Sequence, residues 1–324
     1  MNKSLHSLQS LLIALGVISN KESSTMNPAP ILRMSLVILL SLLAAVAGLR
    51  AAELAVPENV VFERDIEFAN PDGQHLQVNV ARPKNDEGKF PAVVCIHGGG
   101  FRAGKRESYD RLCLTLAQNG YVAITVTYRL APAYPFPAAV LDCKSAVRWL
   151  RANAAKYNVD AARIGVTGGS AGGHLAQFLG VTAGVKEFDA GENLDQSSAV
   201  ACVVNFYGPS DLTKSYGKSV DAAEVLPLFF GGSLHTKWRE HIVGSPLYWV
   251  TPNAAPTLVV HGTDDKYVAY EQAGWMVDKL KASAVEAELL TLEGAGHGFK
   301  GADLEKAEKA LLAFFDKRLK SAGR

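Results

Sequence analysis

The chain has 324 residues, of which 48% are hydrophobic and 20% charged, a composition typical of a globular protein that buries one large core. Its 33 lysine and arginine residues are balanced by 32 aspartate and glutamate residues, so the basic excess of a nucleic-acid-binding protein is missing and no nucleic-acid partner is expected. No segment repeats at a fixed period, which excludes solenoids and propellers.

The first predicted element is a secretory signal within residues 1–51. Met34–Leu49 is an uncharged apolar run with an arginine before it and small residues after it, the pattern of a cleaved signal peptide. A membrane-spanning helix needs roughly 20 apolar residues, more than this run supplies, and no cysteine follows it to carry a lipid anchor. A start at Met26 or Met34 would give a signal of more usual length, and an uncleaved anchor is the alternative interpretation. We therefore expect a secreted or periplasmic protein without a stable membrane span, folded as a single domain over residues 52–324.

Strands and helices alternate from residue 52 onward. An opening pair of strands is predicted at Val60–Phe68 and Leu76–Ala81, with the turn Asn70–Gly73 between them. Ala92–Ile96 is apolar throughout, as expected of a strand that is buried on both faces. The remaining predicted elements, in chain order, are strand Tyr121–Tyr128, helix Ala138–Ala154, strands Ile164–Thr167, Val200–Tyr207, Thr257–His261 and Ala287–Leu292, and a final helix that includes Leu304 and Leu319. The alternation predicts an α/β protein with a mostly parallel sheet covered by helices on both faces.

One long connection, from Tyr207 to Thr257, shows no clean alternation. Connections of this length are usually functional, so a lid or a pocket wall is one interpretation, and an ordinary crossover helix with long flanks is the other. The connection contains the bulky apolar residues Leu228, Phe229 and Phe230. We predict that these three side chains shape a substrate pocket, with burial in the core as the alternative.

The four cysteines, at positions 95, 113, 143 and 202, are too few for a scaffold built on disulfides, and their spacing matches no metal site. Two of them lie within apolar strand-like runs, where a thiol behaves as a small hydrophobic side chain. We expect four free thiols, with one disulfide as the alternative.

The sequence GGSAG at Gly168–Gly172 follows a predicted strand and precedes a predicted helix. A G-x-S-x-G nucleophile needs this context, because the serine sits on a strained bend and glycines let the strand and the helix approach each other around it. A glycine-rich turn without a chemical role is the alternative, and the position between strand and helix favours the nucleophile. Ser170 is therefore the candidate.

A serine hydroxyl is a poor nucleophile, so it needs a base, an acid that orients the base, and donors for the developing anion. Three loops at the ends of predicted strands supply these groups, namely His97–Phe101, His261–Asp265 and Glu293–Phe299. The glycines at 98–100 let backbone N–H groups point into a cavity and bind an oxyanion, although a tight turn would have the same composition. The order serine, aspartate, histidine along the chain is that of α/β-hydrolases and points to His297 as the base.

Three aspartates compete for the role of partner to His297. In α/β-hydrolases the acid usually lies on the later of the two candidate loops, so Asp211 is predicted to cap a helix instead. Asp264 and Asp265 are neighbours. Adjacent side chains in an extended loop point in opposite directions, so only one of the two can face His297.

Together these motifs resemble the bacterial hormone-sensitive-lipase-like esterases and the neighbouring acetyl-xylan and feruloyl esterase-like group, over roughly residues 60–320. The segment Tyr128–Pro132, with Pro135–Ala138 and Asp142, is similar to one that these families share. The resemblance implies an α/β-hydrolase fold with a small lid-like insertion. Many hormone-sensitive-lipase-like members have aspartate where this chain has Gly169, which shifts the resemblance toward the secreted polysaccharide-esterase-like group.

Carried over by position, the resemblance implies Ser170 as the nucleophile, His297 as the base and Asp265 as its partner. Asp265 is the aspartate that fits the family pattern H-G-x-x-D-x-x-V. The resemblance also implies a supporting role for His97, which would brace the glycine loop through hydrogen bonds. The implied oxyanion hole consists of the backbone N–H groups of Gly99, Gly100 and Ala171.

The expected chemistry is acyl transfer from an ester through a covalent serine intermediate, with no metal and no organic cofactor. Small to medium esters are the expected substrates, among them acetyl or feruloyl groups on polysaccharide. An amidase or peptidase, such as an arylformamidase-like enzyme, would use the same triad. A non-catalytic binding protein on the same scaffold is a third interpretation, but such a protein would be expected to lack one of the three residues.

Overall fold

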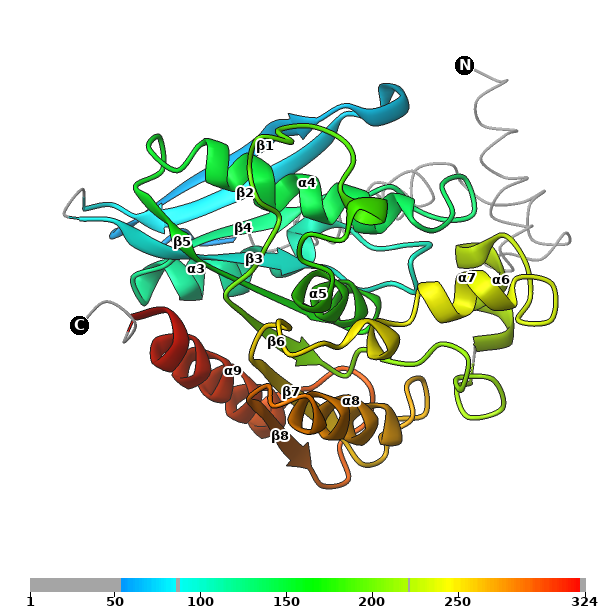
Figure 1. The fold of residues 1–324 in the computed structure, drawn as a ribbon. Helices are drawn as coiled ribbons and strands as arrows, with labels where there is room; N and C mark the ends of the chain where they lie inside the picture. The colour runs from blue at the N-terminus through cyan, green and yellow to red at the C-terminus, as the bar shows by residue number, and fades with distance from the viewer. Residues whose placement is uncertain (1–53, 86–87, 221, 321–324) are drawn as a thin grey trace, which may run out of the picture. The chain divides into compact units, whose positions relative to one another are not determined.

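The computed structural model describes residues 54–85, 88–220 and 222–320, so the predicted signal in residues 1–51 lies outside the described residues. In the unit that begins at Val56, eight strands form one sheet in the order β1-β2-β4-β3-β5-β6-β7-β8 (Figure 1). The strands are β1 (Val60–Ala69), β2 (Leu76–Pro83), β3 (Phe90–Ile96), β4 (Val122–Val126), β5 (Val159–Gly169), β6 (Cys202–Phe206), β7 (Thr257–Gly262) and β8 (Ala287–Leu292). The β1–β2 and β2–β4 pairs are antiparallel, and every pair from β4 to β8 in the sheet order is parallel. The mostly parallel sheet is confirmed.

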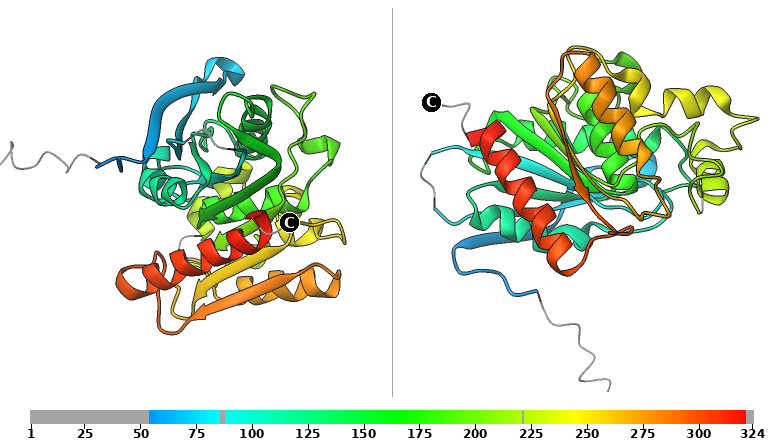
Figure 2. Two further views of the ribbon diagram at one scale, coloured as in Figure 1. Left: turned by 90° about the vertical axis from the view of Figure 1, so that its left-hand side faces the viewer. Right: turned by 90° about the horizontal axis from the view of Figure 1, so that it is seen from below.

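Helices cover both faces of this sheet, as the alternation predicts (Figure 2). The helices on one face are α3 (Asp110–Gln118) and α9 (Gly301–Phe315), and those on the other are α4 (Ala138–Ala152), α5 (Ala171–Val181) and α8 (Glu271–Ala282). Two helices that the sequence analysis did not single out, α3 and α8, also bury apolar residues at helical spacing. Beyond α9 the chain makes one π-helical turn at Asp316–Lys320.

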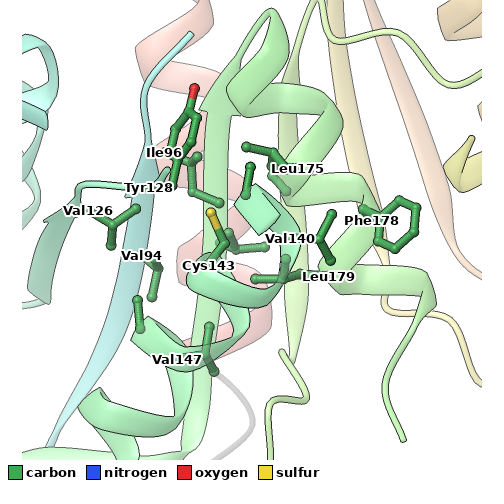
Figure 3. Packing of buried hydrophobic residues seen from close by; sticks show 14 of the residues in the cluster. Val94, Ile96, Val126, Tyr128, Val140, Cys143, Val147, Leu175, Phe178 and Leu179 are labelled. Atoms are coloured by element: carbon green, nitrogen blue, oxygen red, sulfur yellow. The ribbon is translucent and has the colours of Figure 1, made fainter. Parts of the chain in front are cut away.

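The central strands are apolar throughout because both of their faces are covered. Every residue of β4 and of β6 is buried, and β3 is buried from its second residue onward. On one face, Val94 and Val126 face the α4 side chains Val140 and Val147 (Figure 3). All four cysteines are buried and free, as expected.

The long connection after β6 carries two short helices, α6 (Ala222–Phe230) and α7 (Trp238–Val243), and a 3-10 turn at Pro246–Trp249. Figure 1 shows α6 and α7 in yellow tones beyond the end of the sheet. Over the described residues, no helix combines the length and the apolar character needed to cross a bilayer.

Candidate active site

Ser170 lies in the sharp turn between β5 and α5. Its backbone dihedrals, φ 57° and ψ −123°, are sparsely populated by residues other than glycine, so the surrounding structure must hold them. The Ser170 N–H donates to the carbonyl of Phe206 (2.9 Å), and the Ser170 carbonyl accepts from His174 N–H (3.0 Å). The packing is tight, because a Cβ on Gly172 would lie 2.1 Å from the carbonyl oxygen of Ile96. The turn therefore fixes the serine at the carboxyl edge of the parallel strands.

The structure brings Ser170, His297 and Asp265 together from three different strand ends. Ser170 Oγ lies 2.9 Å from His297 Nε2, and His297 Nδ1 lies 2.7 Å from Asp265 Oδ2. An ionised carboxylate only accepts hydrogen bonds, so Nδ1 carries the hydrogen and donates it. In the neutral ring, Nε2 is then left to accept the hydroxyl hydrogen of Ser170. This is the arrangement in which histidine acts as a base toward serine.

Asp265 is held as a buried anion. Its Oδ1 accepts the backbone N–H groups of Tyr267 (2.8 Å) and Val268 (2.9 Å), while His261 Nε2 lies 3.3 Å from Oδ2. Burial alone would raise the pKa of Asp265. Hydrogen bonds from His261, His297 and the backbone N–H of Val268 outweigh burial and hold the pKa well below its usual range. The acid therefore stays charged and can orient His297.

His261 is a part of the site that the sequence analysis did not single out. It is fully buried, and its Nε2–H donates to the carbonyl of Val268 at 2.9 Å. This bond closes the loop that carries Asp265. The signal that could have identified it is its position as the first residue of the H-G-x-x-D-x-x-V pattern.

The other two aspartates face away from His297. Asp264 is exposed and forms an ion pair with Lys266. Asp211 is fully buried; it accepts hydrogen bonds from Thr213 N–H (3.0 Å) and Tyr248 Oη (2.9 Å). No helix begins at Asp211, so the prediction that it caps a helix is wrong. Its carboxylate instead closes a turn by binding the N–H two residues ahead, as aspartate commonly does in loops.

The glycine loop after β3 has a conformation that side chains would block. Gly99 has φ +119°, and a Cβ on this residue would lie 2.2 Å from the carbonyl oxygen of Ala103. The Gly99 carbonyl accepts the N–H groups of Arg102 and Ala103 at 3.2 and 3.0 Å. His97 Nδ1–H donates to the Gly98 carbonyl at 2.7 Å. Because the loop folds back on its own carbonyl groups, its shape is fixed.

His97 contacts the loop and not the triad. Its ring stacks on Tyr128 with 4.3 Å between ring centres, and Tyr128 Oη donates to the His97 carbonyl at 2.9 Å. Burial lowers the pKa of His97, which favours the neutral ring.

Ala171 is the first residue of α5. The first N–H groups of a helix have no acceptor within the helix, and its amino end carries a partial positive charge. Ala171, Gly99 and Gly100 all line the cavity that contains Ser170. The backbone at this point can therefore bind an anion that forms beside Ser170.

The cavity has a volume of about 490 Å³. One wall comes from strand-end loops and carries the triad. Another comes from the long connection after β6, which contributes Pro209, Leu212, Ser215, Ser219, Ala222, Val225 and Leu226. The interpretation of this connection as a pocket wall is confirmed.

The prediction that Leu228, Phe229 and Phe230 line the pocket is wrong. None of the three lines the cavity, and Phe229 and Phe230 are 1% and 3% exposed within the core. The ring of Phe229 stacks on that of Phe101 at 3.9 Å. The apolar stripe of α6 runs along the helix, so its first half covers the cavity and its second half covers aromatic core residues.

Three tyrosines, at positions 109, 207 and 267, also line the cavity. A Cβ on Gly169 would lie 2.9 Å from the hydroxyl oxygens of both Tyr109 and Tyr207. The two hydroxyls thus occupy the space that a side chain at position 169 would need, which accounts for glycine there. Burial raises the pKa of Tyr207 to about 12, so its hydroxyl stays neutral. Tyr207 directly follows β6, a strand end that the sequence analysis did not treat as part of the site.

The chain matches the model of the BD-FAE family over residues 78–280, more than half of its length. It is 36% identical over 216 residues to Esterase LipC from Mycobacterium tuberculosis, a match that covers 64% of this chain and 53% of LipC. The chain therefore spans about half the length of that relative. It is 30% identical over 261 residues to an ethyl acetate hydrolase from Pseudomonas putida, covering 76% of this chain and 79% of that protein.

A solved structure gives the same result for the fold. A truncated carbohydrate esterase from gut microbiota aligns with a TM-score of 0.71 at 26% identity, over 80% of this chain and 96% of that one. The family match includes Ser170 and Asp265, and His297 lies beyond its last residue. The chain belongs to the BD-FAE family and has the α/β-hydrolase fold.

Proposed function

We propose that this protein is a secreted serine esterase that removes short acyl groups, acetyl above all, from the hydroxyl groups of carbohydrates. The observation that carries the proposal is the continuous contact from Ser170 Oγ through His297 to Asp265 at the wall of a cavity. Export is supported by the apolar run Met34–Leu49.

The acylation half of the reaction begins at Ser170. His297 Nε2 accepts the hydroxyl proton while Oγ attacks the ester carbonyl carbon. The carbonyl oxygen becomes an anion, which the N–H groups of Gly99, Gly100 and Ala171 stabilise. Asp265 stabilises the imidazolium that forms. The tetrahedral intermediate then expels the alcohol, which leaves with the proton from Nε2, and the acyl group remains on Ser170.

Water completes the cycle. His297 Nε2 takes a proton from a water molecule, the resulting hydroxide attacks the acyl carbon, and the same donors hold the second oxyanion. The proton returns to Ser170 Oγ as the carboxylic acid leaves. Every proton in the cycle moves between the substrate, water, Ser170 and His297, so the triad suffices for the reaction.

The preference for short acyl groups rests on the wall of the cavity. Val225 reaches within 3.3 Å of the position that a Cβ on Gly100 would occupy, so branched side chains stand directly beside the proposed oxyanion site. The similarity to an ethyl acetate hydrolase supports acetyl as the acyl group, and the similarity to a carbohydrate esterase supports a sugar as the alcohol.

The experiment that tests the proposal measures acetate release from acetylated xylan, together with hydrolysis of p-nitrophenyl esters of increasing chain length. The chain should release acetate, favour acetyl over octanoyl, and react with a fluorophosphonate. Ser170→Ala should lose both ester hydrolysis and the reaction with the fluorophosphonate. It should keep the wild-type melting temperature, because the Ser170 Oγ faces a cavity and not the core. Activity on feruloylated xylan alone would move the assignment to feruloyl groups. Near wild-type turnover by Ser170→Ala would refute the mechanism.

A further inference from the structure

Tyr267 is a large aromatic residue at the rim of the cavity. It is 49% exposed and lines the same cavity as Ser170. The centre of its ring lies 5.3 Å from that of His297, with 42° between the ring planes. A half-exposed tyrosine offers a broad apolar face and a polar tip, which together suit a ligand that has both kinds of group.

The chemistry of the triad decides which part of a substrate meets this ring. In acylation, His297 Nε2 gives its proton to the leaving oxygen, which must come within about 2.6–3.2 Å of that nitrogen. The alcohol attached to this oxygen therefore lies beside the imidazole. The rings of Tyr207 and Tyr267 both contact the imidazole. Tyr207 is also packed against Phe299, with 4.8 Å between ring centres, so Tyr267 has the more open face.

The wall beside the glycine loop has a different character. Val225 lies next to Gly100 and, like its neighbour Leu226, lines the cavity without polar side-chain atoms. Hydrocarbon groups gain most from such a wall. The cavity therefore has an apolar side next to the proposed oxyanion site and an aromatic, hydroxyl-bearing rim next to the proton donor.

We infer that Tyr267 is the platform on which the sugar ring of the leaving alcohol stacks, and that it favours carbohydrate esters over esters of simple alcohols. The inference rests on the proposed ester hydrolysis. A sugar ring has a face of C–H bonds that packs on an aromatic ring, and hydroxyl groups at its edge that can bond to polar groups nearby. Ethanol is too small to cover the ring and gains little from it.

The loop that carries Tyr267 holds the platform in place before any substrate arrives. The Tyr267 N–H donates to Asp265 Oδ1 at 2.8 Å, and the Tyr267 carbonyl accepts from Ser219 Oγ. The next contact along the loop is Val220 N–H to the Lys266 carbonyl at 3.0 Å. A ring on a backbone fixed at both ends loses little freedom on binding, which strengthens the contact.

The test compares two substrates with the same acyl group, an acetylated xylo-oligosaccharide and ethyl acetate. Tyr267→Ala should lower kcat/KM for the oligosaccharide roughly tenfold and change that for ethyl acetate less than about twofold. Tyr267→Phe keeps the ring and should stay close to the wild type on both substrates. Trp238→Ala is the matched control, since Trp238 is an aromatic residue that is 61% exposed and does not line the cavity. It should change neither value.

The outcomes distinguish a failure of the inference about Tyr267 from a failure of the proposed ester hydrolysis. Equal losses on both substrates would show that Tyr267 supports the triad and would overturn the inference, as would no loss on either. A tenfold loss in Tyr267→Phe would also overturn it, because the hydroxyl and not the stacking face would then carry the effect. A wild-type protein that hydrolyses neither substrate would overturn the proposed function itself, and the inference with it.

Discussion

Replacing Asp265 by asparagine tests the assignment of the acid, because it changes one hydrogen-bond acceptor into a donor. Two backbone N–H groups, those of Tyr267 and Val268, point at Oδ1 within 2.9 Å. The amide oxygen must take that position, since an NH₂ group there would face two donors. The NH₂ group then faces His297 Nδ1, at the site where Oδ2 now accepts at 2.7 Å. In the variant Nδ1 is therefore forced to accept.

The consequence is a change of tautomer. If Nδ1 of His297 accepts, the ring hydrogen moves to Nε2, and Nε2 can no longer take the proton of Ser170. In a serine protease triad, loss of the correct tautomer lowers turnover about 10⁴-fold, which corresponds to about 5 kcal/mol of barrier. His261 keeps its carbonyl acceptor at 2.9 Å, so the loop should remain closed and the loss should appear in kcat. We therefore expect Asp265→Asn to lower kcat by roughly 10³–10⁴-fold.

The assay is steady-state hydrolysis of p-nitrophenyl acetate, with circular dichroism to confirm the fold. Asp264→Asn removes an exposed carboxylate and should leave kcat within about twofold. Asp211→Asn disturbs a fully buried network with Thr213 and Tyr248, so it should lower the melting temperature far more than kcat. The reasoning fails if Asp265→Asn keeps more than about a tenth of wild-type turnover. It fails equally if a folded Asp264→Asn or Asp211→Asn variant is the crippled one.

Three further predictions concern the pocket, the core and the amino terminus. Val225→Ala should enlarge the acyl side of the cavity and raise the ratio of butyrate to acetate hydrolysis several-fold; an unchanged ratio across p-nitrophenyl esters would contradict this. Phe229→Ala should cost roughly 3–5 kcal/mol of unfolding free energy in urea and leave the ratio unchanged, because its ring is in the core. On export from a bacterial host, Edman sequencing should find a mature chain that begins near residue 52, and a retained Met1, Met26 or Met34 would argue against the signal.

The residues at strand ends could be found from the sequence because parallel strands leave the sheet at one edge. Ser170, Asp265 and His297 each follow a recognisable apolar strand, so their proximity follows from the alternation of strands and helices. Gly169 could be noted as a departure from a family pattern. The reason for glycine at this position is that two tyrosine hydroxyls from distant segments fill the space of a side chain, and this could not be derived from the sequence.

The residues of the pocket wall were harder to derive, because they depend on which part of α6 lies over the cavity and which part lies over the core. The stripe on α6 includes Val225, Leu226, Phe229 and Phe230, and any of them could face the cavity as far as helical spacing is concerned. Only the packing in three dimensions, which buries Phe229 and Phe230 in the core cluster and outside the cavity lining, shows that the second half of the stripe is core. Similarly, Asp211 looks like a helix cap in sequence. One of its partners, Thr213, is local, but the other, Tyr248, lies on a segment that no local pattern connects to it. The signal in residues 1–51 stays a prediction.

The packing of α6 against the glycine loop couples the shape of the acyl pocket to the position of the anion-binding backbone. Val225 covers Gly100, the ring of Phe229 stacks on Phe101, and Glu224 pairs with Arg102, so three consecutive loop residues each touch the helix. A chimera that exchanged this helix for one from a relative would therefore displace backbone donors as well as reshape the wall. Laboratory evolution of broader acyl scope through α6 should therefore meet a trade-off with rate.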